Sequence, residues 1–430
     1  MYNNQMNIDK DPPDPTIGPT PGPTIDPTPG PTPDPTTGPK YVNRGTYGCI
    51  YQPMIQCSAS ISPFVAEQYI SKISKQNDSE ERIGTLLRHI PHYQYYFAPI
   101  IMSCPINLGE IDEREIKKCE IMDDLSKESK EQNPISEYKS YKIRYVGKYH
   151  VAKYIDIIRG DSSKNIVGKC IEMHIHLLRA LTKMGNAHLV HYDLKNNNII
   201  IDDRYHTPII IDFGISFETT SLDTFDYVTY KNIFYSDYNV YPPWCIDIIL
   251  LSYIILNVPD IYQVTDPAAI PAVFDRIISD MEMKHLEDTY IKFLTDNQVY
   301  KNMTMSPKTT PAPPSATIEN PTNDAEWKTA EETKMKRLLV PFLGKTWKEL
   351  IAKLIVNIGS WDNYSLAIIM KEIMKSYNEP SPYIDILTHI IASDPETRPT
   401  AEKTLNEIIE WTQTQPPAQT QVQPPTQLQP

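Results

Sequence analysis

The chain has few cysteines for its 430 residues, and none of them form a C-x-x-C pair. The six cysteines are scattered, at positions 49, 57, 104, 119, 170 and 245. No signal-peptide pattern follows Met1, so nothing in the sequence indicates an oxidising compartment. We therefore expect reduced thiols and a cytoplasmic location.

The sequence also lacks a long apolar run and an excess of positive charge. The longest apolar run, 246–258, is interrupted by Asp247, Ser252 and Asn257, and it is too short and too polar to cross a bilayer. Lysine and arginine number 41 against 54 acidic residues, which gives a formal net charge of −13. No global basic field attracts nucleic acid. We expect a soluble chain with neither a membrane nor a nucleic-acid partner.

Proline is abundant instead, and it gathers at both ends of the chain. Twelve of the first forty residues are proline, in repeats with Thr, Gly and Asp. Because proline removes backbone donors and little else there can be buried, the composition predicts a disordered, partly polyproline-II arm over 1–40. A Gln/Pro tail over 413–430 is predicted to be disordered for the same reason. We favour solvated tails. The alternative is that they dock proline-reading partner domains.

A short polar run in the middle of the chain concentrates groups that phosphoryl transfer requires. Asp193 can orient an attacking hydroxyl and accept its proton, and Lys195 can neutralise charge on the moving phosphate. Two apolar strands then lead to Asp212. Asn198 and Asp212 offer the oxygen ligands that Mg²⁺ prefers. Since Asn198 follows Asp193 by five positions, one loop can aim both groups at the same phosphate.

This run resembles the catalytic loop and the metal-binding loop of eukaryotic-type protein kinases. The pattern H-R-D-L-K-x-x-N is matched except at Tyr192, which replaces the arginine, and a D-F-G motif follows. A polar turn between two buried strands is the alternative, but it is disfavoured by so many positions at the family's spacing. The resemblance implies that Asp193 and Lys195 are catalytic. It also implies that Asn198 and Asp212 hold Mg²⁺.

A predicted hairpin upstream resembles the kinase glycine-rich loop. Glycine at its tip lets backbone N–H groups approach phosphates without a Cβ in the way. By itself such a hairpin is better explained as an ordinary turn. Its position before the catalytic loop is what favours a role in nucleotide binding. The first glycine of the pattern is replaced by asparagine and its valine by isoleucine. The resemblance assigns to ATP the residues Asn43, Gly45, Thr46, Tyr47, Gly48 and Ile50.

The strand predicted over 65–73 carries Lys72 in Y-I-S-K-I, which resembles the V-A-I-K strand of kinases. A lysine on a strand is usually a solvated surface group, but the flanking motifs favour a role in binding the α- and β-phosphates. A helix should follow, with Asp78 as its N-cap. Glu80 lies on its apolar stripe, so we choose Glu80 as the partner of Lys72. The alternative is Glu81, which is better placed to close a capping box.

Two further strands, over 95–106 and 141–146, complete the predicted small lobe. The charged segment 110–136 between them is expected to be a solvated insertion. The order of elements in the family implies that residues 145–147 form the hinge, whose backbone binds adenine.

An amphipathic helix predicted over 167–184 leads into the catalytic loop. Its His174 and His176 are two positions apart and therefore face different ways on a helix. No cysteine or carboxylate cluster joins them, so we expect core or surface histidines rather than metal ligands.

The segment after D-F-G, 216–241, is rich in Thr, Ser, Tyr and Asp. Because Tyr192 stands in place of the loop arginine, a phosphorylated segment would lack its usual cationic partner. We therefore predict that activity is not switched mainly by phosphorylation of this segment.

Landmarks of the large lobe follow, with two departures from the family. Y-P-P-W at 241–244 stands where kinases have A-P-E, so the glutamate is missing. A D-P-E-T-R-P-T turn contains Arg398, which normally pairs with that glutamate, and the partner of Arg398 is left open. W-D-N-Y-S-L-A resembles the start of the central helix, in which Asp362 would brace the catalytic loop. The long spacing between these landmarks predicts an insertion over about 247–359.

The resemblance implies an α+β, bilobal protein-kinase-like fold: a small antiparallel β lobe over 41–146 and a larger α-helical lobe over 147–412, with ATP and Mg²⁺ between them. Lys195, two positions after Asp193, resembles the serine/threonine pattern, so a protein substrate is expected. The motif set is also similar to kinases of giant, large DNA viruses, which implies a place in host cytoplasm or in the virion.

Two alternatives remain at this point. A pseudokinase scaffold, which recruits partners through its proline-rich ends, is favoured by the altered glycine-rich loop, by the missing A-P-E glutamate and by the substitution at Trp244. The complete set of phosphate- and metal-binding residues opposes it. A small-molecule kinase of related fold is disfavoured by the D-F-G motif and by Lys195.

Overall fold

The computed structural model describes residues 38–45, 48–57, 68–128, 137–160, 166–224, 226–234, 243–245, 247–248, 251–252, 255, 347–375, 382–393 and 395–414. The expected proline-rich arm and C-terminal tail lie outside them, apart from residues 38–40 and 413–414. Residues 413–414 belong to the last helix, α16 (Ala401–Thr414), so the expectation of disorder is wrong for these two residues.

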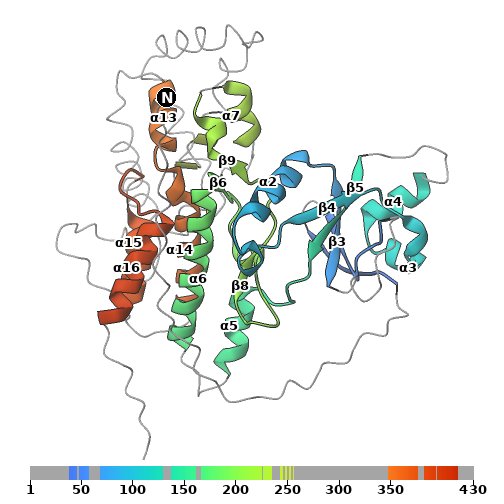
Figure 1. The fold of residues 1–430 in the computed structure, drawn as a ribbon, viewed down its shortest axis with the longest axis horizontal. Coiled ribbons are helices and arrows are strands. Elements are labelled where there is room, and N and C mark those ends of the chain that lie inside the picture. Colours follow the sequence, from blue (N-terminus) through green and yellow to red (C-terminus); the bar gives the residue numbers. More distant parts are fainter. Residues whose placement is uncertain are drawn as a thin grey trace, which may run out of the picture.

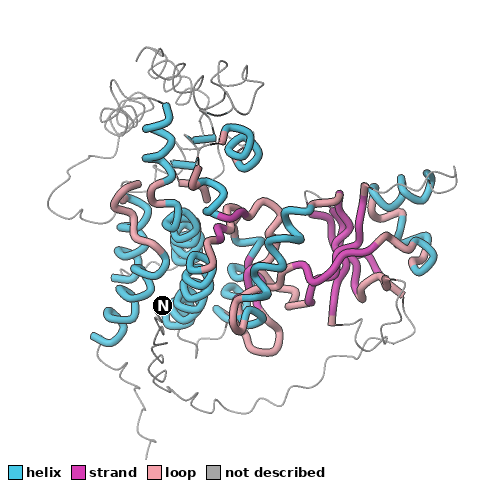
Figure 2. Tube along the Cα trace, turned by 45° about the horizontal axis from the view of Figure 1, so that its top comes forward, coloured by secondary structure: helices cyan, strands magenta, loops and turns pink. Residues whose placement is uncertain are grey.

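An antiparallel sheet forms the N-terminal part of the described chain. Its strands are β1 (Lys40–Gly45), β2 (Gly48–Gln52), β3 (Tyr69–Lys75), β4 (Ile100–Cys104) and β5 (Tyr138–Arg144). They lie in the order β1-β2-β3-β5-β4. Figure 2 shows the strands on one side of the molecule and most of the helices on the other. The predicted hairpin is present, with β1 and β2 joined between Gly45 and Gly48.

The expectation of a solvated insertion between the last two strands is wrong. The segment folds into a 3₁₀ turn, η2 (Leu108–Glu110), and two helices, α3 (Glu113–Ile116) and α4 (Glu120–Glu128). The helices lie beside the sheet, on the side away from the main helices (Figure 1). Ile116, Cys119, Met122 and Leu125 are buried against Tyr51 and its neighbours. Their spacing of about three is helical, but the surrounding charges concealed it.

Helix α2 (Asp78–His89) follows β3, as predicted, but it begins one residue earlier than expected. Asn77, not Asp78, is the N-cap: its backbone is extended, and its side chain accepts a hydrogen bond from the Glu80 N–H at 3.1 Å. Glu81 does not close a capping box and instead pairs with Lys139 at 3.2 Å. The Asn77 side chain precedes the first turn and can reach its free N–H groups. Asp78 lies within that turn and is not placed to cap it.

The C-terminal part of the described chain is mainly helical. Its long helices are α5 (Val151–Arg159), α6 (Ile166–Asn186), α14 (Trp361–Lys375), α15 (Pro382–Ala392) and α16. Shorter elements are α7 (Tyr227–Ile233), α13 (Trp347–Ile355), and the strand pairs β6 (Leu189–Val190) with β9 (Phe217–Glu218) and β7 (Ile199–Ile201) with β8 (Pro208–Ile210). The 3₁₀ turns are η1 (Tyr93–Tyr95), η4 (Asn196–Asn198), η5 (Thr219–Leu222) and η8 (Ile358–Ser360).

Helix α6 lies at the centre of this part and matches the predicted helix. Its buried residues Leu177, Leu178 and Leu181 share one core with side chains of α14, α15 and α16. The same core includes Ile199, Ile210 and Phe213, which flank the polar run singled out in the sequence. The described elements therefore confirm the α+β class. None of the described helices is both long and apolar enough to cross a membrane.

Of the insertion expected over 247–359, the structure describes residues 247–248, 251–252, 255 and 347–359. Asp247, Ile248, Leu251, Ser252 and Ile255 are all buried, as expected of the start of a core helix. The boundaries of the insertion stay a prediction.

The expectation of reduced thiols is wrong for four of the six cysteines. Cys49 is bonded to Cys119 and Cys57 to Cys104, whereas Cys170 and Cys245 are free and buried. The partners are 70 and 47 residues apart, so only the folded sheet and its helices bring them together. The cytoplasmic location stays a prediction.

His174 lies in the helical core, as expected for a histidine without a metal. Its Nδ1 is 2.8 Å from the hydroxyl of Tyr383, and burial lowers its pKa to about 3. His176 stacks on Tyr96, and its Nε2 lies 2.9 Å from the carbonyl oxygen of Tyr95. Neither ring belongs to a cluster of metal-ligating side chains among the described residues.

We expect His174 to make the free energy of unfolding fall as the pH is lowered. Below the ordinary histidine pKa of 6.5, His174 is protonated in the unfolded chain. In the folded protein it stays neutral down to about pH 3, because burial lowers its pKa. The loss is about 1.4 kcal/mol per pH unit across that window. Urea unfolding at about pH 7 and about pH 5 measures it, and His174→Asn should flatten the slope. His389→Asn, at an exposed position on α15, should not. Equal slopes for His174→Asn and wild type would contradict this assignment.

Candidate active site

Lys72 connects the sheet to the helix α2 and to the D-F-G segment. From β3, its Nζ lies 2.9 Å from Glu80 Oε1 and 2.8 Å from Asp212 Oδ1. The side chains of Lys72 and Glu80 are only 13% and 5% exposed. The predicted choice of Glu80 over Glu81 as the partner of Lys72 is therefore confirmed. The short connection suffices because Asn77 begins α2 directly after the strand.

The charges of this cluster are set by its members. Burial alone would lower the pKa of Lys72, but the carboxylates of Glu80 and Asp212 raise it well above its ordinary value. Burial tends to raise the pKa of Asp212, yet the charge and hydrogen bond of Lys72 hold it below its ordinary value. At neutral pH the Lys72 ammonium and the Asp212 carboxylate are therefore both charged and lie side by side.

The catalytic-loop candidates converge on the carboxylate of Asp193. Lys195 Nζ lies 2.8 and 3.1 Å from its two oxygens, and Asn198 Nδ2 donates to Oδ2 at 3.0 Å. Asn198 Nδ2 also donates to the Asp193 carbonyl at 2.9 Å, because the turn η4 folds the chain back. The structure thus brings together Asp193, Lys195 and Asn198, as the local spacing predicted.

Buried hydrogen bonds hold this loop in place. Asp362 Oδ2 and Oδ1 accept from the N–H groups of His191 and Tyr192 at 2.7 and 3.0 Å. The bracing predicted for Asp362 is therefore confirmed. His191 Nε2 lies 3.0 Å from the Ile211 carbonyl, which can only accept, so this nitrogen carries the proton. That bond ties the catalytic loop to the residue before Asp212.

Asp212 itself has a φ of 61°, in the left-handed region that few residues other than glycine adopt. Such a conformation costs about 1–3 kcal/mol and persists where the surroundings enforce it. The ion pair with Lys72 and the His191–Ile211 bond lie on either side of it. The strain aims the carboxylate at Lys72.

The donor set fits a hard divalent cation. Asn198 donates its amide N–H groups to Asp193, which leaves the amide oxygen as an acceptor, and the Asp212 carboxylate is 38% exposed. Carboxylate and amide oxygens suit Mg²⁺, which takes its other ligands from water and phosphates. The described residues contain no cluster of three or more His, Cys, Asp or Glu around a metal position, so a closed structural metal site is not among them.

The glycine-rich hairpin lies beside Lys72 in the sheet. Ile50 faces Asn43 across β1 and Lys72 across β3. A Cβ at Gly48 would lie 2.1 Å from the Ile73 carbonyl oxygen, so this glycine is required by the close approach of β3. The side-chain oxygen of Asn43 accepts from the Arg44 N–H at 2.8 Å. The predicted residues Thr46 and Tyr47, at the tip, lie outside the described residues.

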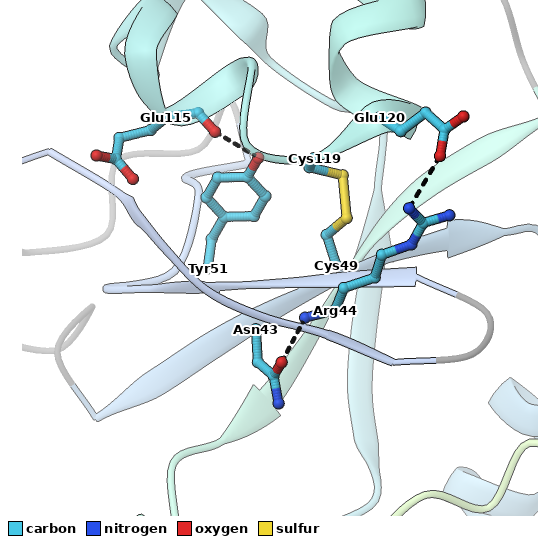
Figure 3. Close-up of a disulfide and its surroundings, with 7 residues drawn as sticks. All are labelled: Asn43, Arg44, Cys49, Tyr51, Glu115, Cys119 and Glu120. Atoms are coloured by element: carbon cyan, nitrogen blue, oxygen red, sulfur yellow. Dashed lines mark hydrogen bonds and ion pairs between the residues drawn. A yellow bond between two sulfur atoms is a disulfide. The ribbon is translucent and has the colours of Figure 1, made fainter.

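The α3–α4 helices anchor this hairpin (Figure 3). The Cys49–Cys119 disulfide joins β2 to the connection between the two helices. Arg44 pairs with Glu120 at 2.9 Å, and the Tyr51 hydroxyl donates to the Glu115 carbonyl at 3.1 Å. Sequence reasoning missed this support. The helical spacing of the buried residues in 111–125 was the signal that could have found it.

Part of the expected hinge is already hydrogen-bonded within the protein. The Tyr145 N–H donates to the Gln68 carbonyl at 2.9 Å, and the Val146 carbonyl accepts from the Asp203 N–H at 3.2 Å. A Cβ on Gly147 would lie 2.3 Å from the Ile201 carbonyl oxygen. The contact between this segment and adenine stays a prediction.

Arg398, whose partner the sequence left open, forms a buried ion pair with Asp247. Its Nη1 and Nη2 lie 2.7 and 3.2 Å from the two carboxylate oxygens, and both side chains are almost fully buried. An acidic residue is therefore present, three positions after Trp244 rather than within the 241–244 motif. The sequence signal was an aspartate in an otherwise apolar run. Asp394 of the same turn as Arg398 lies outside the described residues.

No family model and no curated protein matches this chain. Among solved structures, the chain is similar to the kinase PK-1 of Cydia pomonella granulovirus. The identity is 15%, the match covers 55% of this chain and 77% of that one, and the TM-score is 0.28. The function proposed below rests on the side-chain geometry described above.

Proposed function

We propose that this protein is an ATP- and Mg²⁺-dependent kinase that phosphorylates serine or threonine of protein substrates. In this proposal the sheet with α2–α4 is the small lobe and the helical part is the large lobe of a bilobal kinase fold. One observation carries the proposal: Lys72 on the sheet is paired with both Glu80 and Asp212, which joins the phosphate-binding side of the site to the D-F-G segment.

The chemistry follows from these placements. Lys72 binds the α- and β-phosphates, while Asn198 and Asp212 would hold Mg²⁺, which neutralises phosphate charge when bound. Asp193 orients the substrate hydroxyl and accepts its proton as the oxygen bonds to the γ-phosphorus. The bond from the γ-phosphorus to the β-phosphate oxygen breaks, and ADP leaves with the electron pair. Lys195, beside Asp193, places positive charge where the phosphoryl group passes.

Serine/threonine specificity is proposed from Lys195 at its position two residues after Asp193. Action on a protein rather than on a small molecule is proposed from the D-F-G motif and the turn that carries Arg398. We also propose that the protein acts in host cytoplasm or in a virus particle. Its two proline-rich ends would then bind proline-reading partner domains.

A catalytically weak scaffold is the second candidate. The altered glycine-rich loop and the substitution at Trp244 favour it. The missing A-P-E glutamate no longer does, because Asp247 supplies a carboxylate to Arg398. The retained cluster of Lys72, Glu80 and Asp212 also weighs against it, since a scaffold does not need a charged phosphate site.

With Mg²⁺ and ATP, the purified protein should transfer the γ-phosphate to generic serine/threonine substrates. Chelation of Mg²⁺ should abolish transfer, because the metal that Asn198 and Asp212 would hold neutralises the charge of the phosphates. Lys72→Met should lower kcat/KM by at least about 100-fold through loss of phosphate binding and of the bond to Asp212.

Lys75→Met is the matched control, since Lys75 ends the same strand with an exposed side chain that pairs with Glu137. It should keep near wild-type activity. Transfer by Lys72→Met at the wild-type rate would refute the site. ATP binding without transfer by the wild type would favour the scaffold.

A further inference from the structure

The peptide backbone of Tyr192 is held by a side-chain hydrogen bond on each side. Its N–H donates to Asp362 Oδ1 at 3.0 Å, and its carbonyl accepts from the indole Nε1 of Trp244 at 2.6 Å. Tyr192 has a φ of 69°, which few residues other than glycine adopt. The carbonyl held by Trp244 belongs to the peptide bond that leads into Asp193. Trp244 therefore acts on the backbone that aims the Asp193 carboxylate.

The ring of Trp244 also covers Tyr192. The two rings stack with centroids 4.8 Å apart and an interplanar angle of 30°, and both side chains are buried. Trp244 is fixed from both directions along the chain. Ser365 Oγ donates to the preceding Pro243 carbonyl at 2.6 Å, and Asp247 pairs with Arg398. The Trp244 side chain is thus anchored to the helical core and packs against the catalytic loop.

Two phenylalanines from the segment after D-F-G meet the same tyrosine. Phe217 on β9 and Phe234 after α7 lie edge-on to Tyr192, with centroids 5.5 and 6.0 Å away and interplanar angles of 78° and 72°. Edge-to-face aromatic pairs of this kind are stabilising beyond the apolar area that they bury. The segment after D-F-G is therefore attached to the catalytic loop by packing on Tyr192. In the kinase pattern this position holds an arginine that pairs with a phosphate.

We propose that Trp244 is a positioning residue for Asp193, and that the aromatic cluster of Tyr192, Phe217, Phe234 and Trp244 docks the activation segment without a phosphate. The inference deepens the proposed kinase function and rests on it. The indole N–H of Trp244 holds the catalytic loop, and the ring of Tyr192 holds the segment after D-F-G through Phe217 and Phe234. Activity is then set by permanent packing rather than by a modification that adds charge.

Trp244→Phe tests the positioning role, because it keeps an aromatic ring and removes the N–H donor. We expect kcat to fall about tenfold with little change in the KM for ATP, as befits loss of an interaction that orients Asp193 and not the nucleotide. Amide hydrogen exchange over 191–198 should become faster.

The matched control is Trp361→Phe. Trp361 is buried next to Tyr192, but its Nε1 has no hydrogen-bond partner among the described residues, so this variant loses ring area without losing a donated bond. It should change exchange over 191–198 and kcat much less than Trp244→Phe does. Equal effects of the two variants on both readouts would overturn the positioning role.

A phosphatase treatment tests the docking role. Phosphatase-treated protein, verified as unphosphorylated by mass spectrometry, should keep its activity within about twofold, because the contacts carry no phosphate charge. Loss of activity on dephosphorylation would overturn this part. The exchange measurement needs no turnover, so an inactive wild type with loop exchange that still depends on Trp244 would refute the kinase function alone.

Discussion

Asp193→Asn is expected to lower kcat for phosphoryl transfer by roughly 10²–10⁴-fold, the usual contribution of a positioned proton acceptor. The substitution preserves shape and removes the charge that orients the substrate hydroxyl and receives its proton. It also removes the ionic partner of Lys195, which lies 2.8 Å away. ATP binding should persist, because Lys72 and Asp212 are untouched. Steady-state kinetics and nucleotide titration by calorimetry separate the two quantities.

The control for Asp193 is Asp156→Asn, an exposed aspartate on α5 that pairs only at the surface with Arg159. Its kcat should match the wild type. If Asp193→Asn retained wild-type kcat, Asp193 would not be the proton acceptor. If it lost nucleotide binding together with kcat, the carboxylate would instead support the ATP site.

Asp247→Asn is expected to lower the free energy of unfolding by about 3–5 kcal/mol, the cost of leaving one charge of a buried pair uncompensated. Arg398 and Asp247 are 1% and 0% exposed, so water cannot replace the lost carboxylate. The Arg398 guanidinium stays charged in the variant, because the ordinary pKa of arginine lies far above neutral. Because Trp244 lies three positions before Asp247, loss of the pair should also loosen the hydrogen bond from Trp244 to the catalytic loop. Urea unfolding followed by circular dichroism gives the number.

The double variant Asp247→Leu/Arg398→Met separates charge from fold. Removal of both charges should recover most of the stability that the single variant loses, since well-packed apolar residues often replace a buried pair at little cost. The exposed pair Lys75–Glu137 serves as the control, and Glu137→Ala should cost less than about 1 kcal/mol. If Asp247→Asn cost no more than Glu137→Ala, the buried pair would not stabilise the protein.

The parts of the site that the sequence predicted are those linked by short-range geometry. Asp193, Lys195 and Asn198 lie on one turn, so their spacing alone determines that they meet. Glu80 could be chosen over Glu81 because helical periodicity placed it on the buried face. In each case only a few residues separate the groups, so the spacing in the chain limits how far apart their side chains can lie.

The parts that the sequence did not predict depend on contacts between distant segments. The Arg398–Asp247 pair, the Cys49–Cys119 disulfide and the bond from Trp244 to Tyr192 join residues 151, 70 and 52 positions apart. No periodicity links such positions, because the intervening chain takes its path from packing as a whole. The helices α3 and α4 were missed for a different reason: the helical spacing of their apolar residues is present in the sequence, but the surrounding charges concealed it.

The amino-acid sequence by itself therefore determined the α+β class and which polar residues of the candidate site lie together. Those features require particular side chains at fixed local spacing. Only the tertiary structure decided which acid satisfies Arg398, which cysteines pair, and how a tyrosine stands in the place of an arginine. In each of these cases several residues of the chain have the right chemistry to be the partner. The packing of distant segments selects one of them.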